Sequence, residues 1–204
     1  MSRFTGPRVK VMRALGTELP GLSRKSIGDR PHPPGQHGAR SNRRKSDYGL
    51  QLIEKQKLRF NYGLTETQIR RLFREAKRDK GPTGEKLLEL LESRLDNAVF
   101  RAGFAPTGIA ARQLVRHRHV LLNGRSVNIP SIRVRVGDVI TLTLKARQIG
   151  IVVASLAEPA LTRPEWLGWN DKDAAATVVR LPEPDEVPFP VNVQDVVEYY
   201  AVRM

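Results

Sequence analysis

Residues 107–144 read TGIAARQLVRHRHVLLNGRSVNIPSIRVRVGDVITLTL, a helix-forming segment that passes into a strand-forming one. Thr107 is a suitable N-cap, and the apolar residues after it recur three and four positions apart, so we expect a helix to about His117. Asn123-Gly124 then separates two short apolar runs. Asn-Gly favours a two-residue hairpin turn because both turn positions need positive φ. The stretch therefore predicts a helix followed by a hairpin.

Two more strands and one earlier helix complete this interpretation. Apolar and basic residues alternate over residues 132–136, which is typical of a half-buried strand, and residues 139–144 form the next strand. Upstream, leucines recur at helical spacing over residues 83–102. On one such helix Arg94 and Arg101, seven residues apart, share a face. We expect an α+β fold: a helical N-terminal lobe and a small module of two helices packed on a small, mostly antiparallel β-sheet.

The remaining segments are placed by composition. Gly and Pro interrupt the N-terminal segment, which we interpret as an irregular basic arm. Helices are expected over Tyr48–Phe60 and from Thr65, which forms a capping box with Gln68. Prolines make residues 158–190 mostly loop, and a short helix covers Val193–Val202. The expected domains are 1–46 (arm), 47–93 (helical lobe), 94–155 (module of helices and sheet) and 156–204 (Pro-rich segment and C-terminal helix packing back on the body).

The composition excludes several classes of protein. The chain has 204 residues and no cysteine, which excludes a disulfide scaffold, a thiolate metal site and a cysteine nucleophile. Its longest uncharged apolar run, Ile151–Ala157, is far shorter than the ~20 residues that span a bilayer. No apolar stretch follows the charge at the N-terminus, so we expect no secretory signal. These features are typical of a soluble cytoplasmic protein.

The charge is large and unevenly distributed. The formal net charge is +14; residues 1–80 hold 20 Lys and Arg against 7 Asp and Glu, whereas residues 148–204 hold 4 against 9. Most basic residues are Arg, whose guanidinium binds phosphate at two points. A membrane-surface helix needs a continuous apolar face, and Pro and Gly interrupt the basic residues 30–45. The pattern predicts that the basic end meets a polyanion and the acidic tail meets protein or solvent.

Polar residues on two successive helices indicate that the polyanion is RNA. Arg94 and Arg101 form one pair, Arg112 and Arg116 form a second, and residues 117–119 extend the second pair to the sheet. Structured RNA is bound mainly through phosphates, sugars and shape, for which such side chains are suited. Six Phe, four Tyr and two Trp are too few for a platform that stacks single-stranded bases.

Motifs along the whole chain resemble one known family. Those of the module are Ser93-Arg94-Leu95-Asp96-Asn97, Ala111-Arg112-Gln113-Leu114-Val115, Val120 to Gly124, Val127-Asn128-Ile129-Pro130-Ser131 and Gly137-Asp138. Those outside it are Pro33-Pro34-Gly35-Gln36-His37-Gly38, Ser46-Asp47-Tyr48-Gly49, residues 54–59, Thr83-Gly84-Glu85, Pro190-Val191-Asn192-Val193 and Glu198-Tyr199-Tyr200. Together they resemble the bacterial and plastid ribosomal protein S4 family, and the segment Pro33 to Gly38 is its most specific motif.

The resemblance implies a role and a set of partners. Members are structural, non-enzymatic proteins of the small ribosomal subunit that bind 16S ribosomal RNA early and nucleate assembly of the subunit body. They contact ribosomal protein S5, a contact tied to translational accuracy, and they line the mRNA entry path. Some bacterial members repress their own message. No small-molecule substrate, cofactor or metal is implied for this chain, and the location is the ribosome of the cytoplasm or of the plastid stroma.

Four positions depart from the family pattern. Val9 and Met12 stand where many members have the first two of four zinc-binding cysteines, so the resemblance is to the zinc-free branch, as in cyanobacteria and plastids. Gly108 stands where Arg is usual and removes one phosphate contact. Arg118 stands where Gly is usual and supplies one nearby.

These considerations give a set of expected contacts. The motif Pro33, Pro34, Gly35, Gln36, His37 and Gly38 is structural. The residues expected to contact ribosomal RNA are Arg3, Arg40, Arg43, Arg44, Lys45, Tyr48, Lys55, Lys57, Arg59, Arg70, Arg71, Arg74, Arg94, Arg101, Thr107, Arg112, Gln113, Arg116, His117, Arg118, His119 and Asn123.

Some residues have two interpretations. His117 and His119 contact RNA or pack within the fold, and Tyr48 stacks on a base or, as we favour, packs on Leu52. Asp96 is expected to pair with Arg112 or Arg116, and Trp166 and Trp169 to be core or interface anchors. Two other functions use the same module: an RNA-modifying enzyme, for which no catalytic domain is evident, and a transient ribosome assembly factor.

Overall fold

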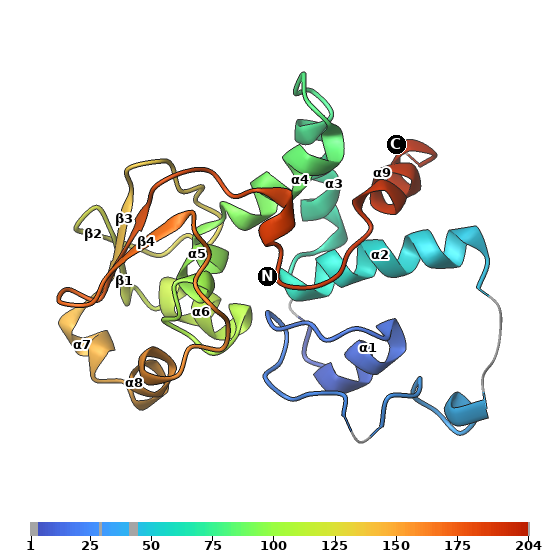
Figure 1. Ribbon diagram of the computed structural model, residues 1–204, viewed down its shortest axis with the longest axis horizontal. Helices are drawn as coiled ribbons and strands as arrows, with labels where there is room; N and C mark the ends of the chain where they lie inside the picture. The colour runs from blue at the N-terminus through green and yellow to red at the C-terminus, as the bar shows by residue number, and fades with distance from the viewer. Residues whose placement is uncertain (1–3, 29, 41–44, 204) are drawn as a thin grey trace. The chain divides into compact units, whose positions relative to one another are not determined.

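The structure is a computed structural model, and it describes residues 4–28, 30–40 and 45–203. The chain divides into two compact units, which are described separately below (Figure 1). Unit 1 consists of residues 1–87 and 188–204, and unit 2 of residues 88–187. The predicted contacts Arg3, Arg43 and Arg44 lie outside the described residues.

Unit 1 is helical in the part that the structure describes. Its elements are α1 (Arg8–Leu15), the 3-10 helix η1 (Gly38–Arg40), α2 (Asp47–Asn61), α3 (Glu66–Ala76), the first half of α4 (Thr83–Glu92) and α9 (Val193–Ala201). The capping box at the start of α3 is confirmed: Thr65 accepts from the Gln68 backbone N–H, and Gln68 accepts from that of Thr65. The N-terminal arm is predicted to be irregular throughout, but it contains helix α1. Gly16 ends this helix in the left-handed conformation.

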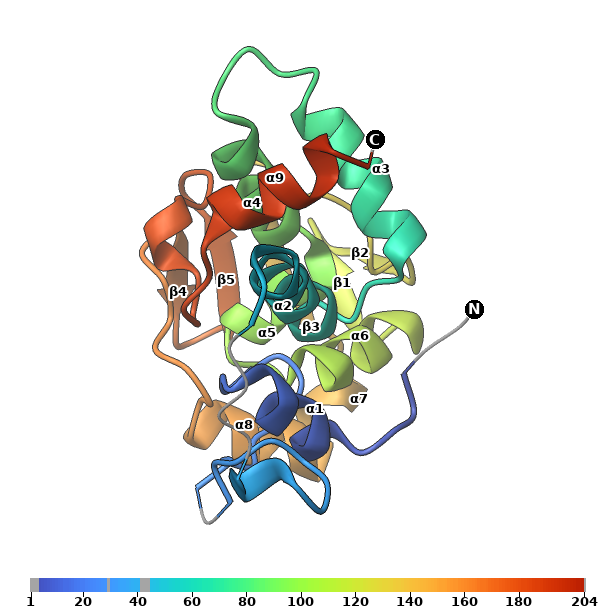
Figure 2. The ribbon, with the colours of Figure 1, turned by 90° about the vertical axis from the view of Figure 1, so that its right-hand side faces the viewer.

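The C-terminal helix belongs to the core of unit 1. Figures 1 and 2 both show α9 beside α2. Val196 and Tyr200 of α9 are fully buried, and the Tyr200 ring lies 5.0 Å from that of Phe73 in α3. Gly84 in α4 lies so close to Val193 that a Cβ atom there would collide with the Val193 side chain. The two ends of the sequence therefore build one hydrophobic core.

Unit 2 consists of short helices and one antiparallel sheet. The helices are α5 (Leu95–Arg101), α6 (Gly108–Arg116), α7 (Leu144–Arg147), α8 (Gly150–Ala157) and the 3-10 helix η2 (Pro184–Glu186). The strands are β1 (Val120–Leu122), β2 (Arg125–Val127), β3 (Val139–Leu142), β4 (Leu167–Asn170) and β5 (Ala175–Val178), in the order β2-β1-β3-β5-β4. All four pairings between the strands are antiparallel, which confirms the α+β class.

One core joins the helices and the sheet of unit 2. Val99 and Phe104 from the helical side and Ile140 from the sheet are fully buried in it. Trp166 is also fully buried there, as predicted, and Trp169 packs against it and against the Phe104 ring at 5.5 Å. The hairpin is confirmed: Asn123 and Gly124 both have positive φ, and Val120 pairs with Val127.

The continuous helix predicted over residues 83–102 is wrong. The chain is extended at Arg94, between α4 and α5. The reason also explains the missing strand at 132–136: Leu95 donates its backbone N–H to Ile132, and Val134 donates to Ser93. Residues 130–134 thus hydrogen-bond to the helix break, and only one isolated bridge, between Arg94 and Arg133, forms there. Arg94 and Arg101 consequently do not share a helix face.

Residues 158–190 are mostly loop, as predicted, but they also contain two strands that the sequence did not indicate. Strands β4 and β5 lie in this segment, and β5 pairs with β3 through Val139 and Ile140. The prolines remain outside these two strands, where they cost no ladder hydrogen bond.

Candidate nucleic-acid interface

Helix α6 and the turn after it present polar side chains to solvent. Thr107 caps α6 by accepting from the Ala110 backbone N–H. Gln113, Arg116, His117 and Arg118 are exposed, and His119 is half-buried. Because α6 buries its apolar residues against the unit 2 core, these side chains occupy its outer face.

The turn after α6 is fixed to the sheet. Arg118 adopts the left-handed conformation, with φ 61°, and its carbonyl accepts from the Ser126 hydroxyl of β2 at 3.3 Å. Thr143 donates its backbone N–H to the His119 carbonyl at 3.0 Å. The two histidine rings lie 6.1 Å apart. The backbone that carries this polar surface is therefore held at two points.

Asp96 lies between two arginines from different segments. It accepts two hydrogen bonds from Arg94, from Nε at 3.0 Å and Nη2 at 2.9 Å, and one from Arg112 Nη1 at 3.2 Å. The predicted pairing of Asp96 with Arg112 is therefore present. We name Arg94, Asp96 and Arg112 the Asp96 cluster. Burial lowers the pKa of Arg112, Asp96 raises it, and the charges of Arg94 and Arg116 lower it further.

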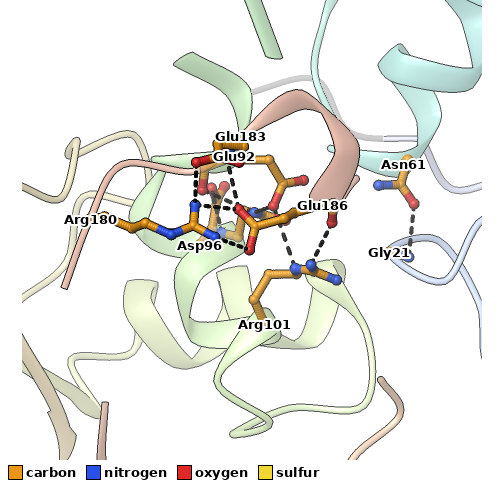
Figure 3. Close-up of polar contacts among 9 residues, drawn as sticks. Gly21, Asn61, Glu92, Asp96, Arg101, Arg180, Glu183 and Glu186 are labelled. Atoms are coloured by element: carbon orange, nitrogen blue, oxygen red, sulfur yellow. Dashed lines mark hydrogen bonds and ion pairs between the residues drawn. The ribbon is translucent and has the colours of Figure 1, made fainter. Parts of the chain in front are cut away.

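Arg101 is part of a buried internal network (Figure 3). Its guanidinium donates to the Glu186 carbonyl at 2.6 Å and lies 3.5 Å from Glu92, whose side chain is 1% exposed. Asn97 also donates to Glu92, and Arg180 binds both carboxylate oxygens of Glu186. Arg101 and Arg94 are 5% exposed, so both serve the fold of unit 2.

The two lysines of α2 likewise form hydrogen bonds inside unit 1. Lys55 is 4% exposed and donates to Glu66 at 2.9 Å. Lys57 donates to Glu54 at 2.7 Å and to the Pro190 carbonyl at 3.2 Å. Burial alone would raise the pKa of Glu66, but the hydrogen bond and charge of Lys55, with Tyr200 and Arg70, lower it below its ordinary value of 4.5.

Two more predicted contacts have structural roles. Thr107 is 8% exposed and is the cap of α6. Asn123 uses both ends of its amide in the turn region: it donates to Asp138 at 2.8 Å and accepts from the Val139 backbone N–H at 2.8 Å. Lys55, Lys57, Arg94, Arg101, Thr107 and Asn123 therefore have internal partners, and we leave these six residues out of the proposed interface.

Unit 1 has a basic surface of its own. On α3, Arg70, Arg71 and Arg74 are exposed, opposite the buried stripe of Ile69 and Phe73. The other exposed members of the predicted set in this unit are Arg40, Lys45 and Tyr48, and Arg59 is half-buried over the Phe60 ring.

Tyr48 packs against residues from the C-terminal end of the chain. Its ring stacks on Tyr199 of α9 at 6.1 Å, and the Arg203 guanidinium lies 4.8 Å from it. Tyr199 is about 150 residues away in the sequence, so local spacing could not identify this partner. About half of the ring, 49%, remains exposed.

The segment Pro33–Gly38 forms a tight turn. Gly35 has φ 109°, and the Gly38 backbone N–H donates to its carbonyl at 3.2 Å. A Cβ atom at Gly38 would collide with the Pro33 carbonyl. His37 is exposed at this turn. The glycines are thus needed by the backbone, as the structural interpretation of this motif predicts.

Three exposed arginines of unit 2 were not predicted as contacts. Arg125 lies on β2, and Arg133 and Arg135 lie between the hairpin and β3. The alternation of Arg133 and Arg135 with buried Val134 was the signal that could have identified them. In the described part of the chain, no three His, Cys, Asp or Glu side chains group as metal ligands do. Among those residues, too, no helix is long and apolar enough to cross a membrane.

Comparisons with known proteins cover the whole chain. Residues 3–92 match the family described as ribosomal protein S4/S9 N-terminal domain, and residues 93–140 match the S4 domain. Small ribosomal subunit protein uS4 of Methylobacillus flagellatus is 67% identical over 205 residues, covering 100% of both chains. Protein uS4B of Nitrosomonas europaea is 63% identical with the same coverage. Protein uS4 of the cyanobacterium Nostoc punctiforme is 50% identical over 98% of each chain. The chain belongs to the ribosomal protein S4 family.

Proposed function

We propose that this protein is a structural component of the small ribosomal subunit that binds 16S ribosomal RNA and nucleates assembly of the subunit body. The observation that carries the proposal is the match of the entire chain, through both units, to proteins named small ribosomal subunit protein uS4. The protein acts by binding, without catalysis, from its place in the ribosome.

The exposed basic residues support RNA as the ligand. In unit 2 they include Arg116 and Arg118 with the neighbouring His117, beside the half-buried Arg112, and in unit 1 Arg70, Arg71 and Arg74 on α3. A-form RNA is recognised largely through its backbone, and such contacts release counterions. Affinity should therefore fall by orders of magnitude between ~50 and ~200 mM salt. An affinity that stays constant over this range would contradict the electrostatic part of the proposal.

The finer partners follow from family membership. We include contact with ribosomal protein S5, an influence on translational accuracy, contact with mRNA at its entry path and, as in some bacterial members, repression of its own message. The negative charge of residues 148–204 supports a protein partner, because it makes this part of the chain unlike the basic remainder.

The first experiment is a binding titration with protein-free small-subunit ribosomal RNA. Large-subunit RNA and tRNA serve as competitors at matched salt. Nanomolar-range binding that survives both competitors is expected of a specific primary binder. Binding that either competitor abolishes would contradict a specific site.

A second experiment distinguishes a core component from an assembly factor. Small subunits are sedimented through a gradient at high salt, and the protein is quantified in each fraction. We expect it to remain with the subunit, whereas a transient factor is washed off. Incubating the protein with RNA and assaying for modified uridine tests the enzyme alternative, for which we expect no product.

A further inference from the structure

The Asp96 carboxylate is fully used by groups of its own unit. Besides the three hydrogen bonds from Arg94 and Arg112, it accepts one from the Asn97 backbone N–H at 3.1 Å. The Asp96 side chain is 7% exposed and that of Arg94 is 6% exposed, whereas that of Arg112 is 20% exposed. Arg112 is therefore the member of the Asp96 cluster that reaches solvent.

Two guanidinium groups share one carboxylate, and Arg116 follows Arg112 by one helical turn on α6. A guanidinium remains protonated even when burial disfavours its charge. On this part of α6, Arg116 is exposed and Arg112 is partly exposed, so both guanidinium groups lie where a phosphate can approach them.

Holding a long side chain in advance makes its contacts stronger. A free arginine loses rotamer freedom when it binds phosphate, and that loss weakens the complex. In this structure the Asp96 carboxylate already holds the Arg112 guanidinium at its Nη1 atom. The entropy of ordering Arg112 is therefore lost when the protein folds, before RNA is bound.

We propose that Asp96 is a positioning residue for RNA binding, which fixes Arg112 so that its guanidinium contacts a phosphate of the RNA. This inference rests on the proposed function. An acidic residue would then strengthen the binding of a polyanion, although its charge repels one. Arg94 neutralises Asp96 inside the fold, and Arg112 is the more exposed of the two guanidinium groups.

Replacing Asp96 tests the proposal because two physical effects have opposite signs. The Asp96→Asn variant is more positive by one charge, so charge alone would tighten RNA binding. Loss of positioning would weaken it, by roughly 3- to 10-fold. We expect weaker binding to small-subunit ribosomal RNA in a filter-binding titration at fixed salt. Unchanged or tighter binding would overturn the proposal.

A double-mutant cycle separates positioning from general damage to the fold. Arg112→Ala removes the phosphate contact and should lower the slope of log affinity against log salt by about 1. Asp96→Asn should lower the slope similarly, and it should cause no further loss of affinity in the Arg112→Ala background. Equal losses of affinity in both backgrounds, with an unchanged slope in Asp96→Asn, would show a merely structural role.

Two further measurements keep the outcome decisive. Thermal unfolding confirms that each variant is folded at the assay temperature. If Asp96→Asn does not fold, Asp96→Glu keeps the charge but displaces the carboxylate by one methylene, and the same cycle applies. If the unaltered protein itself fails to bind the RNA specifically, the proposed function fails; if it binds and the cycle is additive, only the positioning role fails.

Discussion

Arg118 shows how one residue serves conformation and binding in opposite ways. Its left-handed backbone conformation, φ 61°, is one that a residue with a Cβ atom adopts at a cost of about 1–2 kcal/mol. Glycine would adopt it without that cost. The exposed guanidinium, however, lies beside Arg116 and His117 on the proposed RNA surface. An arginine at position 118 therefore lowers the stability of the fold but adds a positive charge to the proposed RNA surface.

Arg118→Gly should therefore raise stability while it weakens RNA binding. We expect a gain of about 0.5–1 kcal/mol in the free energy of unfolding, because the relief of backbone strain exceeds the larger conformational entropy that a glycine loses on folding. The slope of log affinity against log salt should fall by roughly 0.7–0.9. Urea denaturation and salt-dependent titrations measure the two quantities. Arg118→Asn, which tolerates the same conformation, is the control for loss of charge alone; an unchanged salt slope in both variants would remove Arg118 from the interface.

The contacts of the half-buried Glu66 with the buried Lys55 and Tyr200 make the stability of unit 1 depend on pH. The pKa of Glu66 is lowered in the folded protein, so its contribution is present above about pH 4.5 and is lost as the pH falls through the folded value. Tyr200 donates to Glu66 at 3.0 Å. Burial and the nearby Glu66 charge raise the pKa of Tyr200, so its hydroxyl keeps the proton that it donates.

Tyr200→Phe should remove part of this pH dependence. The expected loss near pH 7 is about 1–2 kcal/mol, because the ring remains but the hydrogen bond to a charged group is gone. The difference from the unaltered protein should shrink as the pH falls below 4.5, where Glu66 becomes protonated. Urea denaturation between pH 3 and 7 measures both curves. Parallel curves over that range would mean that Tyr200 does not stabilise ionised Glu66.

At the scale of elements, the close contact of α4 with α9 depends on a glycine, Gly84, at the point where the two helices meet. Gly84 is the second residue of α4, where helix propensity favours Ala over Gly by up to about 1 kcal/mol. The Cβ atom would collide with Val193 at the start of α9, and Val is too stiff at χ1 to move aside at low cost. Close packing therefore overrides local helix propensity at this position.

Gly84→Ala should destabilise the protein by about 1 kcal/mol net, since overpacking costs about 1–3 kcal/mol and helix propensity returns part of it. Adding Val193→Ala should restore most of the loss, which is the signature of a direct steric contact. Gly150→Ala, where nothing lies within 4 Å of the new Cβ, is the matched control. Thermal unfolding of the four proteins provides the comparison, and a stable Gly84→Ala variant would contradict the packing.

Elements that depend on neighbouring residues could be predicted from the sequence, and those that depend on distant ones could not. The capping box of Thr65 and Gln68 and the turn at Asn123-Gly124 each involve residues within a few positions. The break at Arg94 needs residues 130–134, and strand β5 needs β3, more than 30 residues away. Alternating residues cannot reveal whether a segment pairs with a strand or with a helix break.

The same distinction applies to the whole molecule and to the candidate interface. Exposed arginines on α3 and α6 follow from helical periodicity alone. The internal roles of Lys55 and Lys57 do not, because their partners include Glu66, 11 residues away, and the Pro190 carbonyl, 133 residues away. The sequence alone therefore cannot show whether a basic side chain is free to bind a ligand or forms a hydrogen bond with a carboxylate or carbonyl that is distant in the sequence.

Deleting residues 190–204 should destabilise unit 1 and leave the stability of unit 2 unchanged. The deletion removes the buried Val196 and Tyr200 and leaves Lys55 and Lys57 without part of their surroundings. Hydrogen exchange measured by mass spectrometry should show lost protection over residues 47–76 and retained protection over 95–178. Val202→Ala, at a side chain 80% exposed, is the control and should change neither. Unchanged protection over 47–76 in the deleted protein would contradict the role of α9.

The composition of unit 1 from two separate pieces of sequence has a consequence for the order in which the protein matures during translation. Synthesis runs from residue 1, so all of unit 2 has been made before the segment that carries α9 appears. A nascent chain can complete its S4 domain while α2 and α3 still lack their last partner helix. A premature stop codon after residue 189 would therefore release a chain in which the helices made first, α2 and α3, lack the partner helix that completes their core.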